Sequence, residues 1–146
     1  MTRRLLWLIT AAAVVGLAWA IRLALRPDLP ARYRGLSNPV PNANSNLLTG
    51  RRLYVLNCAF CHGVGGRGDG VPAAGLSPRP ADLIQEAAKS SDARLYYRIS
   101  EGERLTGMPA WKDILSDQQR WMVVLYLRHL AGEPPSGSMP GVPDPD

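Results

Sequence analysis

The sequence predicts a helical protein in which one small domain follows an N-terminal apolar helix. First, Leu5–Ile21 is a run of 17 residues without a charge near the start of the chain. Second, helix-start residues precede three later segments, at Thr49, Ser91 and Ser116. Third, no strand pattern precedes the only two cysteines of the chain. A length of 146 residues allows one domain with appendages.

Residues 1–25 are predicted to form a single N-terminal transmembrane helix. The uncharged run of 17 residues lies between arginines and would form a helix about 26 Å long, close to the ~30 Å hydrocarbon thickness of a bilayer. Trp7 and Trp19 stand near its two ends, as interfacial anchors do. The alternative is a signal peptide with Ala18-Trp19-Ala20 as its cleavage site. We expect the segment to be retained as an anchor.

Residues 26–48 are predicted to be a linker. They contain four prolines and the polar run Asn42–Asn46, and they show neither helix nor strand periodicity. Fully extended, the segment would reach roughly 80–90 Å. It would act as a free tether or, in a larger complex, lie along a neighbouring chain.

The segment Cys58-Ala59-Phe60-Cys61-His62 has the C-x-x-C-H pattern of a c-type haem attachment site. Two thiols one helical turn apart can each form a thioether to a haem vinyl group, and the adjacent imidazole can bind the iron as its proximal ligand. We therefore predict that Cys58 and Cys61 hold haem c covalently and that His62 is an axial ligand.

Three other interpretations of the cysteine pair are weaker. A thioredoxin-type redox pair needs a βαβ context. A zinc site would need the distant His129 as its fourth ligand, a spacing that fits no common zinc motif. A disulfide between residues three apart would close a very short loop and add little stability.

The chain after the motif is predicted to be irregular. Gly63, Gly65 and Gly68 match the spacing of a dinucleotide fingerprint, but the match is false because no strand precedes them. We expect these glycines to let the backbone pass close to a flat cofactor. Residues 71–83 are rich in proline and are expected to wrap the edge of that cofactor.

Two residues of this wrap are candidates for contacts with the cofactor or its ligand. The carbonyl near Pro72 is the predicted acceptor for the free ring N–H of His62. Arg79 is predicted either to pair with a haem propionate or to be a solvated surface charge.

Helices are predicted on both sides of this region. A helix capped by Thr49 runs into the cysteine motif, and a second begins at Ser91 or Asp92 and stops at Gly102. A third begins at the capping box Ser116–Gln119 and ends at Gly132. The domain therefore covers residues 49–131, and residues 132–146, with five prolines and three glycines, form a disordered or partner-docked tail.

The candidate for the second axial ligand is Met108. It lies in a Gly-Met-Pro loop, which can bring its thioether to the iron face opposite His62. The alternative is that Met108 only packs. Met122 lies within a predicted helix, where core filling is the ordinary role. His129 is a rival ligand, but its place near a helix end favours a surface or helix-dipole role.

These motifs together resemble those of class I cytochromes c over residues 49–131. Gly50, Tyr54 and Cys58 are spaced four apart, as in the first helix of that family, where the glycine permits close crossing by the last helix. Val123 and Tyr126 resemble the last-helix positions that pack there. The resemblance implies an all-α fold with three core helices around one covalent haem c, with His62 and Met108 as axial ligands.

The order of anchor, linker and domain resembles small cytochrome subunits of bacterial respiratory or photosynthetic membrane complexes. The resemblance implies a single-pass protein of the bacterial cytoplasmic membrane with its haem domain on the periplasmic side. It further implies an electron-transfer protein, not an enzyme, within a hetero-oligomeric complex. Its redox partners would be a quinol-oxidising complex, an oxidase or a reaction centre. The net charge of +5 contains no run of Lys or Arg, so nucleic-acid binding has little support.

Two other functions remain open. In one, Met108 is displaced and the iron serves a sensor or catalytic subunit by binding a ligand. In the other, the anchor and tail hold a complex together and the haem is a relay within it.

Overall fold

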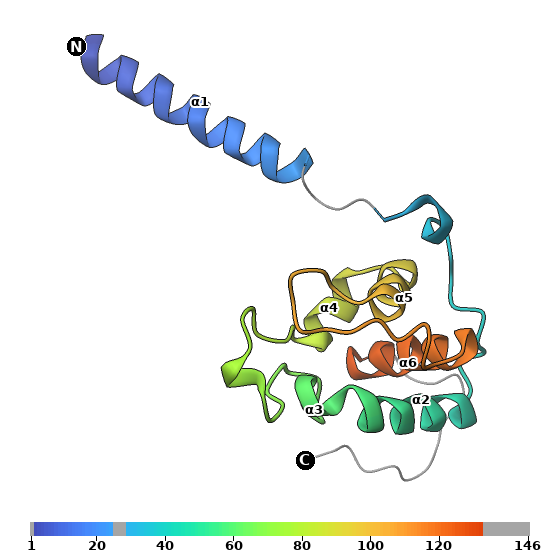
Figure 1. Ribbon diagram of the computed structural model, residues 1–146. Coiled ribbons are helices and arrows are strands. Elements are labelled where there is room, and N and C mark those ends of the chain that lie inside the picture. Colours follow the sequence, from blue (N-terminus) through green and yellow to red (C-terminus); the bar gives the residue numbers. More distant parts are fainter. Residues whose placement is uncertain (1, 25–28, 133–146) are drawn as a thin grey trace. The chain divides into compact units, whose positions relative to one another are not determined.

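The computed structural model of the chain describes residues 2–24 and 29–132. Within these ranges every regular element is a helix, which confirms that the fold is all-α. The chain divides into two compact units, residues 1–30 and 31–146, which Figure 1 colours along the sequence. Met139 and the predicted tail, apart from Gly132, lie outside the described residues.

The first unit contains helix α1, Thr2–Ala24. The side chains of Trp7 and Trp19 on this helix are exposed. Within the part of the chain that the structure describes, which includes side chains 7–19 of α1, no helix is long and apolar enough to cross a membrane.

Helices α2, Asn44–Asn57, and α6, Asp117–Leu130, form the centre of the second unit and lie side by side in Figure 1. Gly50 permits this contact, because a β-carbon there would overlap the backbone of α6 and lie 3.2 Å from Cβ of Tyr126. The rings of Tyr54 and Tyr126 pack with centroids 5.2 Å apart. The structure thus contains the close helix crossing that the resemblance implied.

The start signals predicted for the two later helices are confirmed. Ser116 and Gln119 form the reciprocal capping box of α6. Ser91 accepts a hydrogen bond from the backbone N–H of Arg94 and caps α5, Asp92–Glu101. Helix α5 ends at Glu101 and is capped by Gly102, the predicted stop, whereas α6 ends at Leu130, slightly before its predicted stop.

Helix α4, Leu83–Lys89, precedes α5 in the chain and was not predicted. The carboxylate of Asp82 caps it by accepting the backbone N–H groups of Ile84 and Gln85. The remaining elements are the short helix α3, Ala59–His62, and two 3₁₀ turns, η1 at Ala31–Tyr33 and η2 at Ala73–Gly75.

Helix α2 begins earlier than predicted, at Asn44, inside the segment predicted as a linker. The hydroxyl of Thr49 does not cap the helix; it donates to the carbonyl of Ser45 at 2.9 Å, within the same helix. Leu47 is buried, so the polar run that precedes Thr49 gains an apolar contact that stabilises one more helical turn.

Residues 31–43, which we call the N-terminal strap, also pack on the second unit. Tyr33 is buried, and its ring centroid lies 5.0 Å from that of Tyr97 on α5. Asn38 donates its side-chain amide to the backbone carbonyl of Trp121 on α6 at 2.9 Å. Because of these contacts, residues 31–43 are not a free tether, which was one of the two possibilities predicted for the linker.

Candidate functional site

The cysteine motif follows α2 directly and forms a helical turn of its own. The backbone N–H of Cys58 donates to the carbonyl of Tyr54 at 2.8 Å, which closes α2. The N–H groups of Cys61 and His62 both donate to the carbonyl of Cys58, at 3.2 and 2.9 Å. This turn brings Cys58, Cys61 and His62 to one cavity.

The ring of His62 is held in one orientation by a backbone carbonyl. Its Nδ1 lies 3.1 Å from the carbonyl oxygen of Ala81. A carbonyl can only accept, so Nδ1 carries the proton and Nε2 keeps the lone pair that a metal ligand requires. Burial lowers the pKa of His62, which keeps the imidazole neutral, although the bond to Ala81 opposes the shift. The acceptor predicted near Pro72 is therefore wrong, because the carbonyl of Ala81 takes that place.

The two thiols are not joined in a disulfide. Burial, with a smaller contribution from the neighbouring Cys61, raises the pKa of the Cys58 thiol to about 12. At neutral pH the free Cys58 is thus a thiol rather than the thiolate that a redox pair uses.

The glycine-rich loop packs back onto the motif itself. The backbone N–H of Gly70 donates to the carbonyl of Cys61 at 3.2 Å. A β-carbon at Gly70 would overlap the carbonyl of Phe60 and lie 2.6 Å from that of Cys61. Gly70 therefore requires its small size against the backbone of the motif. The close approach of Gly63, Gly65 and Gly68 to a cofactor stays a prediction.

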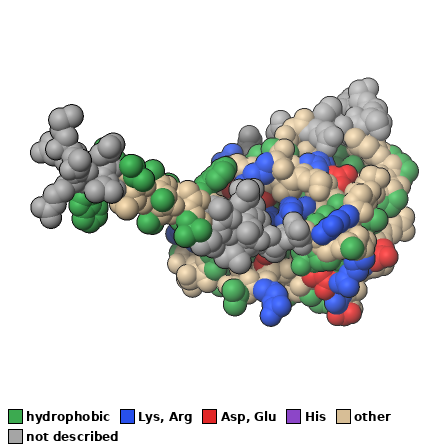
Figure 2. Space-filling model, turned by 90° about the horizontal axis from the view of Figure 1, so that it is seen from above, with side chains coloured by type: hydrophobic (Ala, Val, Ile, Leu, Met, Phe, Trp, Pro, Cys, Tyr) green, Lys and Arg blue, Asp and Glu red, His purple; other side chains and the backbone are tan. Residues whose placement is uncertain are grey.

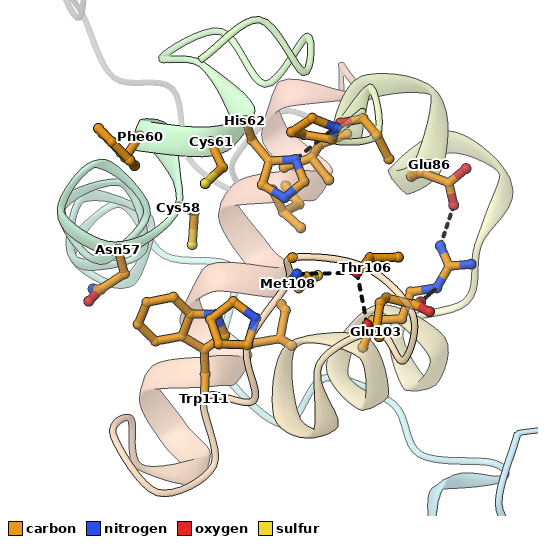
Figure 3. Close-up of a pocket in the computed structure, with 18 of the residues that line it drawn as sticks. Asn57, Cys58, Phe60, Cys61, His62, Glu86, Glu103, Thr106, Met108 and Trp111 are labelled. Atoms are coloured by element: carbon orange, nitrogen blue, oxygen red, sulfur yellow. Dashed lines mark hydrogen bonds and ion pairs between the residues drawn. The ribbon is translucent and has the colours of Figure 1, made fainter. Parts of the chain in front are cut away.

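Met108 reaches the same cavity from the loop between α5 and α6. In Figure 3 the side chain of His62 enters from one side and Met108 lies across from it. Glu103 donates its backbone N–H to the carbonyl of Met108 at 3.2 Å, and Met108 donates its own to the hydroxyl of Thr106 at 3.1 Å. Met122 and His129 do not line this cavity.

The cavity has a volume of about 570 Å³, within the range of sites that hold cofactors. Its wall is largely apolar, with contributions from α4, α5, α6 and the proline-rich segment. The apolar residues on this wall include Leu76, Leu83, Leu95, Ile99, Trp111, Val123 and Leu127. A cavity with an apolar wall, two adjacent thiols, an imidazole with a free lone pair and a thioether fits a covalently held haem.

Arg79 and Arg98 both line the cavity, but they differ in their surroundings. Arg79, the cation singled out in the sequence, is exposed. Arg98 forms ion pairs with Glu86 at 2.5 Å and with Glu103 at 2.6 Å. Burial opposes a low pKa for Glu86, but hydrogen bonds from Lys89 and Arg98 overcome it and lower that pKa.

The sequence analysis missed Arg98, although a signal for it exists. Leu95, Arg98 and Ile99 have the spacing of one helix face, and all three line the cavity. An arginine within an apolar stripe is a sign that the stripe faces something charged.

The other interpretations of the cysteine pair gain nothing from the geometry. Among the described residues, no group of three or more His, Cys, Asp and Glu side chains is arranged to hold a metal ion. His129, the fourth zinc ligand considered above, lies in the last turn of α6, with its ring centroid 6.4 Å from that of Tyr126.

This chain is similar to known proteins in both sequence and fold. The family described as cytochrome c oxidase, cbb3-type, subunit III matches residues 45–127, more than half of the chain. The chain is similar to the cbb3-type cytochrome c oxidase subunit FixP of Bradyrhizobium diazoefficiens, with 32% identity over 99 residues, 68% of this chain and 32% of that protein. It therefore spans about a third of that relative.

Among solved structures, the chain is similar to one from the reducing HAO-like protein complex of Kuenenia stuttgartiensis. The TM-score is 0.56 at 31% identity, over 66% of this chain and 47% of that chain. The similarity covers about half of that solved chain.

Proposed function

Because the chain belongs to the cytochrome c oxidase cbb3-type subunit III family of c-type cytochromes, we propose that it relays single electrons within a respiratory complex. The observation that carries this proposal is the meeting of His62 and Met108, 46 positions apart in the sequence, at one apolar cavity beside two thiols.

Cys58 and Cys61 hold the single haem c through thioethers, and His62 and Met108 are its axial ligands. The sequence contains two cysteines and one C-x-x-C-H motif, which supports one haem per chain. The bond from Nδ1 of His62 to the carbonyl of Ala81 supports Nε2 as the binding atom.

The haem supplies one-electron chemistry when it is bound. The protein supplies a fixed environment: His62 is neutral and oriented, and the apolar wall excludes water. If His62 and Met108 both bind the iron, no position would remain for a substrate, and neither side chain would have to leave on reduction.

The partners of this chain are other redox proteins. FixP is a subunit of a cbb3-type oxidase and the solved relative comes from a multiprotein complex, which supports membership of a hetero-oligomeric assembly. On the face in Figure 2, Lys and Arg lie among apolar and acidic side chains. A small, partly electrostatic contact suits a transient electron-transfer partner.

Helix α1 anchors the chain in the bacterial cytoplasmic membrane, with the second unit on the periplasmic side. The uncharged run Leu5–Ile21 between flanking arginines supports this proposal, because it is longer than the stretch 7–19 whose side chains the structure describes and in which no spanning helix is found. Membranes from expressing cells would be washed with alkaline carbonate and then with detergent. Release by detergent alone supports an anchor, and release by carbonate contradicts it.

The electron-transfer proposal is tested by absorption spectra of the full-length holoprotein, oxidised and reduced, with and without carbon monoxide. Ligation by His62 and Met108 predicts a weak far-red band in the oxidised spectrum and a reduced spectrum that carbon monoxide does not change. A high-spin spectrum or ready binding of carbon monoxide would mean an open iron. The ligand-binding function, with Met108 displaced, would then replace the relay.

A further inference from the structure

The loop that carries Met108 buries little apolar surface of its own. Residues 104–107 are all exposed, and Leu105 is 98% exposed. Leu105 also has φ of +65°, a conformation that costs energy for a residue with a side chain. Such a segment opens easily unless polar contacts hold it.

The polar contacts of this loop converge on Glu103. Its backbone N–H donates to the carbonyl of Met108 at 3.2 Å, which closes the loop. Its own carbonyl accepts the backbone N–H of Thr106 at 3.2 Å and the hydroxyl of Thr106 at 2.8 Å. Figure 3 shows Thr106 bonded both to Glu103 and to Met108. The position of Glu103 therefore sets the position of Met108.

Arg98 connects Glu103 to the helices. Its Nε lies 2.6 Å from Oε1 of Glu103, and its Nη1 lies 2.5 Å from Oε2 of Glu86 on α4. The side chains of Arg98 and Glu86 are 33% and 16% exposed, so this part of the network is shielded from solvent. In Figure 3 Glu86 and Glu103 lie on the side of the cavity away from Cys58 and Cys61.

We infer that Arg98 is a positioning residue for Met108, because it ties the loop to α4 and α5 through Glu103. This inference rests on the proposed function, since it takes Met108 as an axial ligand. The planar guanidinium offers separate N–H groups to two carboxylates at once, whereas a lysine ammonium is a point charge on a flexible stem. A lysine in Arg98→Lys should therefore hold the Met108 loop less firmly than Arg98 does, but more firmly than the methionine in Arg98→Met.

The experiment is a titration of the oxidised, full-length holoprotein with imidazole, followed by absorption. Imidazole binds only the fraction of molecules in which Met108 has left the iron, so its apparent affinity reports how firmly Met108 is held. We expect Arg98→Met and Glu103→Gln each to raise that affinity by roughly threefold to tenfold, as loss of a charge-assisted contact would.

The matched control is Arg94→Met, one turn earlier on α5 and outside the cavity lining, which should stay within about twofold of wild type. The double variant should bind imidazole little more tightly than either single variant, because both changes break the same ion pair between Arg98 and Glu103. Thermal unfolding of each variant checks the fold. If Arg98→Met does not fold, Glu103→Gln carries the test.

The inference is overturned if Arg98→Met or Glu103→Gln folds and binds imidazole as wild type does. A different result overturns the proposed function itself: wild type that lacks the far-red band and binds imidazole without competition. Failure of the inference is therefore measured on the variants, and failure of the proposed function on wild type.

Discussion

The two sides of the cavity are built in different ways. On the His62 side, the ligand follows directly on the two cysteines, and the Gly70 backbone packs against the same turn. On the Met108 side, four consecutive exposed residues precede the proposed ligand. The loop is held by hydrogen bonds of Glu103 and Thr106 to the backbone and by the ion pair between Glu103 and Arg98. Backbone packing thus fixes His62, while a polar network holds Met108, so we expect Met108 to be the more easily displaced of the two proposed ligands.

The largest expected effect comes from removing the covalent attachment on the His62 side. Replacing both Cys58 and Cys61 by Ala should abolish covalent haem, because these are the only thiols in the chain. Haem staining after denaturing electrophoresis measures the result. Phe60→Ala, in the same motif but 65% exposed, should keep its covalent haem. A stained band from the double variant would refute the thioether assignment.

The next largest effect is a difference in stability between two glycine variants, one at Gly70 on the His62 side of the cavity and one at Gly107 on the Met108 side. Gly70→Ala should lower the free energy of unfolding by about 2–3 kcal/mol, because its β-carbon would lie 2.6 Å from the carbonyl oxygen of Cys61. Gly107→Ala should change it by no more than about 0.5 kcal/mol, since its β-carbon meets only a leucine methyl at 3.4 Å. Urea unfolding of the two holoproteins gives both values. Equal losses would contradict the difference between the two sides.

A smaller effect concerns the link between the N-terminal strap and the end of the Met108 loop. Glu101 bonds to Lys112 at 2.7 Å, to Tyr33 at 2.6 Å and to Arg32 at 2.9 Å. These contacts, that of Lys112 foremost, lower the pKa of Glu101 to about 2. A lowered carboxyl pKa contributes stability above its unfolded value of about 4.3, and this contribution is lost as the pH falls toward 2.

Glu101→Gln should therefore cost about 1 kcal/mol at pH 7, a small value because Arg32 and Lys112 are largely exposed. The difference from wild type should shrink between pH 5 and the folded pKa of about 2. Unfolding free energies at several pH values measure it. A difference that stays constant across this range would mean that the Glu101 charge does not hold the strap.

The sequence predicted most of the His62 side and little of what holds the Met108 side. The cysteine motif is contiguous, so its spacing alone predicts Cys58, Cys61 and His62 as haem-binding residues. Met108 could be identified from its Gly-Met-Pro context. The role of Ala81 could not, because a backbone acceptor has no sequence signature. Arg98 had a signal in its place on the helix face of Leu95 and Ile99, but its carboxylate partners, Glu86 and Glu103, become its neighbours only in the fold.

Two other features of the fold, the start of α2 and the order of the N-terminal strap, differ from the prediction because of tertiary contacts. Helix α2 extends back to Asn44 because Leu47 becomes buried, and the strap is ordered because Tyr33 packs on α5. Both depend on tertiary contacts that a local pattern does not contain. Helix α4 is different, since its cap at Asp82 is visible in the sequence and was overlooked.

The assignment of Met108 as an iron ligand can be tested by the proton NMR spectrum of the reduced holoprotein. A methionine methyl bound at the haem iron lies over the ring and is shifted strongly upfield by its ring current. We expect one such methyl resonance in wild type, present in Met122→Leu and absent in Met108→Leu. An upfield methyl that survives in Met108→Leu, or its absence from wild type, would contradict Met108 as the second axial ligand.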